Sequence, residues 1–211
     1  MKKLICFILL FILFFSLTAC FETGKTDNPN TANEFEAIHA ALAAPGAHFT
    51  LSVLTKSGDI TLNASCDIQQ KETYAGTLIE VSYEFEHLNT IEVDADGNIT
   101  FPESMKTTYR GSAKIRDGAL TEMDGETANF PLQVVNVAGI NFTAENLSEY
   151  LFENGTLTAK VKSPSALFGK EIDAKDMNAT ITLSGTSIGS MEITYRTADN
   201  TEITLQYRTV Q

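Results

Sequence analysis

The stretch SMEITYRTADNTEITLQY, residues 190–207, carries the pattern that decides the fold. Apolar side chains at Met191, Ile193 and Tyr195 alternate with polar ones, and the alternation resumes at Ile203 after a turn-forming Asp-Asn pair. A period of two places successive side chains on opposite faces of a β-strand, and Asp and Asn favour tight turns. The stretch therefore predicts two adjacent antiparallel strands with one buried face and one wet face.

The same period recurs through most of the chain. It appears over residues 48–53, 60–68, 79–85, 91–101, 109–116, 157–161 and 179–183. With residues 132–137 as a further candidate strand, the count is about ten or eleven strands. Short turns between consecutive strands favour an antiparallel meander.

Two segments have helical spacing instead. Thr31 and Glu34 have the spacing of a capping box, and Phe35, Ile38 and Leu42 then share one stripe of a helix that ends near residue 43. A second helix is expected over residues 143–152, and an irregular loop over residues 163–175.

These elements predict an α+β fold that is mainly antiparallel β. One curved meander sheet, a half-open barrel of about ten or eleven strands, has an apolar face that two helices must cover. Residues 33–211 are expected to form this single β-rich domain.

The N-terminus carries an export signal. Lys2 and Lys3 precede an apolar run, Leu4 to Leu17, which is shorter than the roughly 20 residues that span a bilayer. The segment Leu17-Thr18-Ala19-Cys20 resembles the lipobox of bacterial lipoproteins. The resemblance implies that residues 1–19 are removed and that the thiol of Cys20 carries a diacylglyceryl group.

Lipidation would fix the location of the protein. Two long acyl chains contribute on the order of 20 kcal/mol of membrane binding, which makes the anchoring effectively permanent. Residues 20–32 are then a lipidated cysteine and a flexible polar tether. The expected location is the extracytoplasmic face of the cell membrane.

Charge and cysteine content limit the partners of the mature chain. Without Lys2 and Lys3, 13 of the 15 Lys and Arg residues remain against 27 Asp and Glu, a formal charge of −14. This acidity disfavours nucleic acid and anionic lipid headgroups. Cys66 is the remaining cysteine with a free thiol, on an apolar strand face, so a packed thiol is expected and an intramolecular disulfide is excluded.

The order of elements is similar to that of the LolA-type and LppX-type lipoprotein folds. In those families a lipidated cysteine and linker precede a helix, a run of strands, helical cover and a closing meander, which SMEITYRTADNTEITLQY resembles. The resemblance implies an incomplete barrel with an apolar cavity for acyl chains. This chain has no Trp, and none of the binding residues of those families can be matched to it.

Motifs of catalysis and metal binding are absent from the sequence. There is no CxxC, HExxH, phosphate-binding glycine loop or G-x-S-x-G elbow. The acidic segment Asp94 to Asn98 has its glycine in the fourth position, which favours a hairpin turn over a calcium loop. Glu84 and Glu86 share one strand face that is expected to meet water. We expect no enzyme activity, no cofactor and no metal.

The leading functional hypothesis is a module that binds a lipid or other hydrophobic ligand in a cavity between sheet and helices. The candidate cover of this cavity is Leu167 and Phe168 of the irregular loop with Leu147 and Leu151 of the second helix. The alternative is a structural or interaction lipoprotein with a packed core, whose acidic surface docks another envelope protein.

Overall fold

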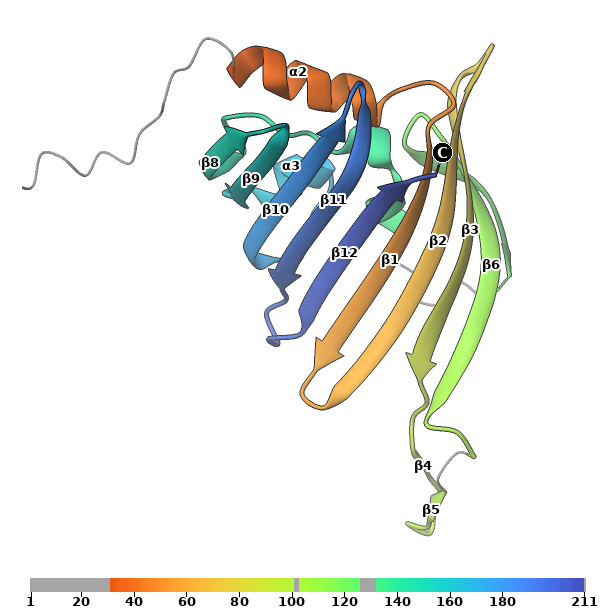
Figure 1. Cartoon of the computed structure of the whole chain (residues 1–211). Coiled ribbons are helices and arrows are strands. Elements are labelled where there is room, and N and C mark those ends of the chain that lie inside the picture. The colour runs from red at the N-terminus through yellow and green to blue at the C-terminus, as the bar shows by residue number, and fades with distance from the viewer. Residues whose placement is uncertain (1–30, 101–102, 126–131, 211) are drawn as a thin grey trace, which may run out of the picture. The chain divides into compact units, whose positions relative to one another are not determined.

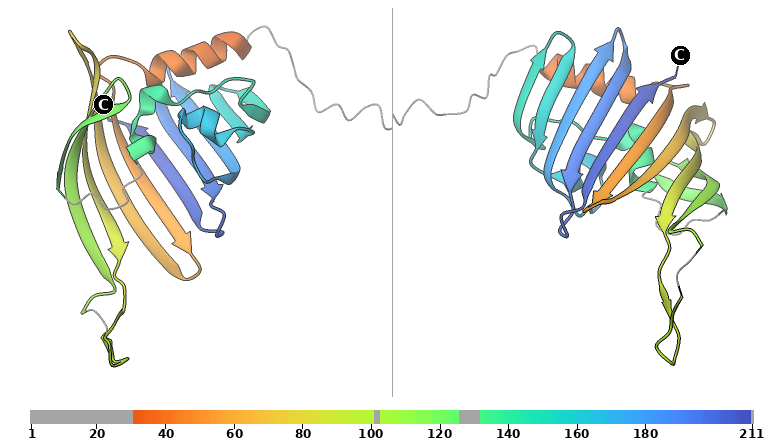
Figure 2. Two further views of the ribbon diagram at one scale, coloured as in Figure 1. Left: turned by 180° about the vertical axis from the view of Figure 1, so that it is seen from behind. Right: turned by 60° about the horizontal axis from the view of Figure 1, so that its bottom comes forward.

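One antiparallel sheet carries most of the chain, of which the computed structural model describes residues 31–100, 103–125 and 132–210. The strands are β1 (His48–Ser57), β2 (Ile60–Thr73), β3 (Gly76–Leu88), β4 (Glu92–Val93), β5 (Ile99–Thr100), β6 (Lys106–Arg116), β7 (Ala119–Gly125), β8 (Leu147–Glu153), β9 (Thr156–Val161), β10 (Lys175–Ser184), β11 (Ser187–Arg196) and β12 (Glu202–Thr209). Ten of them form a sheet in the order β7-β6-β3-β2-β1-β12-β11-β10-β9-β8, and β4 and β5 form a separate ribbon (Figure 1). The sheet is curved and does not close into a barrel, which confirms the predicted fold class (Figure 2).

The sheet consists of two meanders joined through the ends of the domain. Pairing of β1 with β12, for example Leu51 opposite Tyr207, links the first meander to the last. Strands β7 and β8 follow one another in sequence but lie at opposite edges of the sheet. The described part of the chain between them lies against the apolar face, hereafter the inner face, where it forms two short 3-10 helices, η1 (Leu132–Val135) and η2 (Val137–Gly139).

The helices cover part of the inner face. Helix α2 (Thr31–Leu42) lies across one end of the strands, and helix α3 (Pro164–Phe168) lies with η1 and η2 against the sheet (Figures 1 and 2). Ile38 and Leu42 of α2 are fully buried, as the predicted stripe requires. Phe35 of α2 contacts Tyr150 of β8 edge to face, with ring centroids 5.4 Å apart.

The helix expected over residues 143–152 is wrong, because Leu147–Glu153 form β8. A β-bulge between Leu147 and Glu149 breaks the pairing with β9. The bulge adds one residue, so Leu147 and Tyr150 both face inward, and their spacing of three imitates a helical stripe. Pairing with β9 therefore overrides a local pattern that would also suit a helix.

Two further expectations in the middle of the chain are corrected. Residues 132–137 lie in η1 and η2 rather than in a strand, because an apolar run this short fits either structure. The loop expected to be irregular over residues 163–175 contains α3, which begins at Pro164 and ends at Gly169 in the left-handed conformation (φ 65°). Proline at the first position and glycine just after the last are helix signals that the sequence contained.

Two polar side chains fasten the cover to the sheet. The hydroxyl of Tyr207 donates a buried hydrogen bond of 2.7 Å to the carbonyl oxygen of Val134 in η1. The amide of Gln70 in β2 donates to the carbonyl oxygens of Leu42 and Ala44, at 3.4 and 3.1 Å, where α2 ends. These bonds satisfy carbonyl groups that the cover would otherwise leave unpaired.

Candidate functional site

The four predicted cover residues do not form one flexible surface. Leu167 and Phe168 are buried in α3 rather than exposed in irregular chain, and Leu147 is buried at the start of β8. Leu151 is 61% exposed, because the bulge in β8 places it on the other face of the sheet. Three of these residues thus belong to the core, and their role towards a ligand stays a prediction.

The predicted lipidation site, the signal segment and the tether lie outside the described residues. None of the helices in the described part of the chain is both long and apolar enough to cross a bilayer. Lipidation of Cys20 therefore stays a prediction from the lipobox.

Burial falls off along the inner face of the sheet. In the row of Leu51, Cys66 and Tyr83, each residue is at most 5% exposed to solvent. One row further along, Ala64 is only partly buried, and in the next row Leu62 and Ile203 are also partly exposed. In β2 and β12 the apolar alternation thus continues beyond the part of the face that the core excludes from solvent, whereas β1 has Thr55 in this row.

Aromatic rings extend this incompletely covered region across β3 and β6. The ring centroids of Phe85 and Tyr109 are 5.4 Å apart, and those of His87 and Tyr109 are 6.0 Å apart. We define the open inner-face patch as Leu62, Ala64, His87, Tyr109 and Ile203, which are partly exposed next to the buried ring of Phe85. The far ends of β2, β3 and β6, on which most of the patch lies, extend past the described helices (Figure 2).

This patch was not identified as a site from the sequence. The alternation correctly placed Phe85 and Tyr109 on apolar strand faces. Cross-strand pairing of Ala64 with Phe85, and of Phe85 with Tyr109, is what brings the residues together. That register depends on the whole sheet, so no local motif could have revealed it.

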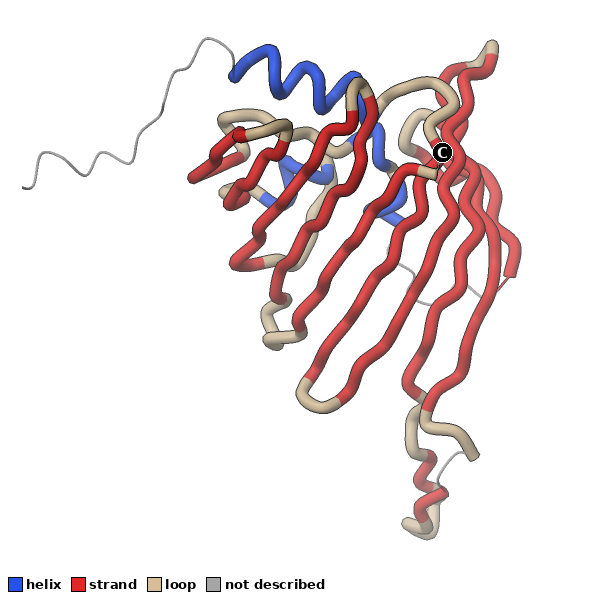
Figure 3. The backbone as a smooth tube through the Cα atoms, in the orientation of Figure 1, coloured by secondary structure: helices blue, strands red, loops and turns tan. Residues whose placement is uncertain are grey.

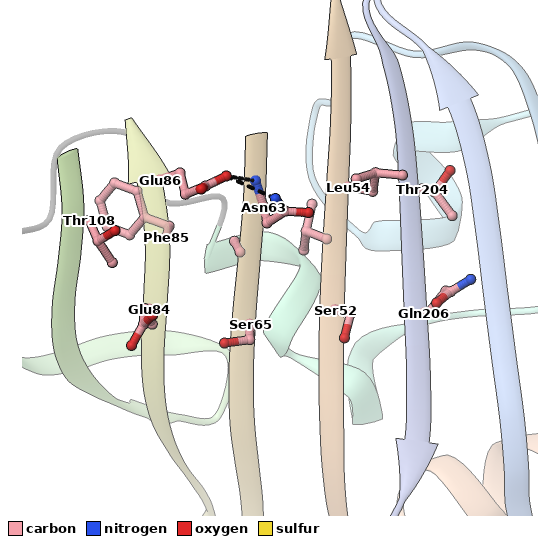
Figure 4. A pocket seen from close by; sticks show the side chains of 12 residues that line it. Ser52, Leu54, Asn63, Ser65, Glu84, Phe85, Glu86, Thr108, Thr204 and Gln206 are labelled. Carbon is pink, nitrogen blue, oxygen red and sulfur yellow. Dashed lines mark hydrogen bonds between the residues drawn. The ribbon is translucent and has the colours of Figure 1, made fainter. Parts of the chain in front are cut away.

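Three hollows lie on the opposite, polar face of the sheet. One hollow of about 420 Å³ is lined by residues that include Ser52, Ser65 and Glu84 (Figure 4). A second, of about 500 Å³, shares these three residues and adds Asp67, which also lines a third of about 260 Å³. Together they form a shallow outer groove, and the predicted cavity between sheet and helices stays a prediction.

Two carboxylates of the outer groove, those of Glu84 and Glu86, accept hydrogen bonds from neighbouring side chains. Glu86 accepts hydrogen bonds from the backbone N–H and side-chain amide of Asn63, at 2.8 and 2.9 Å, and these bonds lower its pKa. Glu84 accepts a bond of 2.6 Å from Arg110. Both glutamates therefore lie on the wet face, as predicted. A lowered pKa keeps Glu86 ionised at neutral pH, where a general acid would need a proton.

Cys66 and Asp94 have structural roles. Burial raises the pKa of Cys66 to about 12, so its thiol is a packing group, as predicted. Asp94 turns the β4–β5 hairpin and accepts bonds from the backbone N–H groups of Asp96 and Asn98, at 2.9 and 2.8 Å. No group of three or more metal-ligating side chains occurs among the residues that the structure describes.

Comparison with known proteins assigns no family. No protein-family model and no curated protein matches the chain. Among solved structures, the chain is similar to a de novo designed fluorescence-activating β-barrel (TM-score 0.22, 13% identity, covering 82% of this chain and 98% of that one). It is also similar to a DUF1329 family protein from Desulfovibrio piger (TM-score 0.32, 7% identity, covering 84% and 92%). At such low TM-scores neither similarity bears on function.

Proposed function

We propose that the protein is an extracytoplasmic lipoprotein, anchored through Cys20, that binds a lipid or another hydrophobic ligand on the open inner-face patch. The observation that carries the proposal is the decline of burial along the inner face. The apolar pattern continues past the covering helices and ends in partly exposed aliphatic and aromatic side chains. Exposed apolar surface of this kind, rimmed by polar residues, is typical of binding sites in soluble domains.

Binding is favoured over catalysis by the chemistry of the two faces. The inner face offers apolar contact area, and an acyl chain gains about 0.8 kcal/mol for each methylene that it buries. The polar face offers carboxylates that are already paired with Arg110 and Asn63. A ligand held by apolar contact needs no nucleophile, metal or cofactor.

A charge placed on the patch tests the ligand site. We expect Ala64→Lys to weaken binding of a fluorescent fatty acid at least about tenfold, because an ammonium group in apolar surroundings is unfavourable. The matched control is Ser65→Lys, one residue further along β2 and on the opposite face. Both variants are made in a chain that begins at Thr31, and binding is measured by fluorescence titration. Equal affinity in both variants, or no uptake by the parent chain, would refute the ligand site.

Membrane anchoring has a separate test. The full chain, expressed in a bacterium, should fractionate with membranes and yield a mature N-terminus at Cys20 with the mass of a diacylglyceryl group. Cys20→Ser should abolish both the added mass and cleavage before residue 20. An unmodified cysteine in the mature chain would contradict the anchor while leaving the ligand site untouched.

A further inference from the structure

A small ribbon projects from the main sheet with its apolar side in water. We call this ribbon, β4 and β5 with their turn and the preceding Ile91, the arm. It extends beyond the ends of β3 and β6 and pairs with no strand of the ten-stranded sheet (Figures 1 and 3). Because Val93 pairs with Ile99, and Ile91 is two residues before Val93, the three side chains share one face.

The apolar face of the arm is unusually exposed. Ile91 is 46% exposed, Val93 62% and Ile99 56%, whereas the aliphatic residues of the sheet core are almost fully buried. The opposite face carries the pair Glu92 and Thr100. The ribbon is thus amphipathic, although its apolar face meets no core within the described chain.

Hydrogen bonds hold the arm in this projecting position. At its tip, Asp94 accepts bonds from two backbone N–H groups, and the side-chain amide of Asn98 donates a third at 2.9 Å. At its base, Asn89 bonds to the backbone carbonyls of Met105 and Ser104, at 2.9 and 2.8 Å. These bonds define the turn at the tip and the pairing at the base of the arm.

The charge of the arm selects the partner. Glu92, Asp94 and Asp96 are exposed on or beside it, as is Glu103 near its base, and residues 89–105 contain no Lys or Arg. Anionic headgroups would be repelled by these carboxylates. In the hydrocarbon layer, the outer backbone edges of a two-stranded ribbon would lose their hydrogen bonds to water.

We infer that the arm docks into another extracytoplasmic protein, in an apolar recess rimmed by Lys and Arg side chains. Ile91, Val93 and Ile99 would fill the recess, while the carboxylates at the tip and rim would meet the basic groups. Burial of the aliphatic face supplies affinity, and the charges supply orientation and rate of association. This interaction is independent of the ligand proposed for the inner-face patch.

Site-specific photo-cross-linking of the full chain in intact cells tests the inference. A benzophenone amino acid replaces Val93 on the apolar face or, as the matched control, Thr100 on the opposite face. Position 93 should yield one discrete protein adduct, to be identified by mass spectrometry, and position 100 should yield little or none. Combining Asp96→Asn with Glu103→Gln should lower the yield at position 93 roughly fivefold, as loss of two rim charges implies, whereas Glu92→Gln, on the control face with Thr100, should change it little.

Four results would overturn the inference. Lipid adducts at position 93 would show that the arm contacts the bilayer instead. Equal adducts at both positions would show that neither face is specific, and absence of adducts would remove the partner. If the adduct forms but a charge reversal at the tip of the arm, Asp96→Lys, is not rescued by Lys→Glu substitutions around the recess of the identified protein, the proposed charge complementarity is wrong.

Discussion

The hydroxyl of Tyr207 is one of the groups that join the sheet to its cover. Tyr207 belongs to the central strand β12, and its hydroxyl meets the carbonyl oxygen of Val134 in a buried environment. Tyr207→Phe would leave that carbonyl unpaired, so we expect the free energy of unfolding to fall by about 1–3 kcal/mol. Tyr74→Phe, in an exposed turn, is the control and should change it little. Urea denaturation measures both, and equal effects would mean that the hydroxyl contributes nothing specific.

Cys66 gives a second prediction at the residue scale. Burial raises its pKa from 9.0 to about 12, so the folded chain keeps the proton at pH values where the unfolded chain has lost it. The stabilisation is fully present below pH 9 and decreases as pH rises towards 12. In a chain beginning at Thr31, iodoacetamide should label Cys66 only as fast as the domain opens. Rapid labelling at about pH 8 without unfolding would show an accessible thiolate.

At the scale of single elements, the alternation of apolar and polar residues predicted strands correctly wherever one face of the strand is packed and the other meets water. It located β1 to β3, β6 and β9 to β12, because each alternates between a packed face and a wet face. It failed at β8, where a bulge shifted the pattern, and at η1 and η2, where a short apolar run fits a strand or a helix. Tertiary pairing decides such segments, and a local window cannot detect it.

Because α3 is a packed helix and not an irregular loop, substitution of its buried residues should destabilise the domain. Leu167 is fully buried, so Leu167→Ala should cost about 2–5 kcal/mol of unfolding free energy. Leu151→Ala, at an exposed position of β8, should change it by no more than about 0.5 kcal/mol. Urea denaturation of the two variants distinguishes core from surface. Similar small losses in both would restore the expectation of a mobile cover.

At the scale of the whole molecule, the sheet is open, and its attachment to a membrane through Cys20 is a proposal. Pairing of β1 with β12 brings the two ends of the described domain together, and the sheet stays open between β7 and β8. The residue pattern predicted this curved, incompletely closed sheet. From the same pattern, we expected the ligand to lie beneath a flexible cover that includes Leu167 and Phe168. Instead, the interior against α3, η1 and η2 is packed, and the partly exposed apolar surface lies further along the same face.

Methyl NMR during titration with a fatty acid tests the central claim most directly. The methyl resonances of Leu62, Ala64 and Ile203, on the open inner-face patch, should shift with one common dissociation constant. Those of Leu54, which lies on the opposite face beside the outer groove, should stay in place. Shifts confined to Leu54, or no shifts at all, would contradict a hydrophobic ligand site on the inner face.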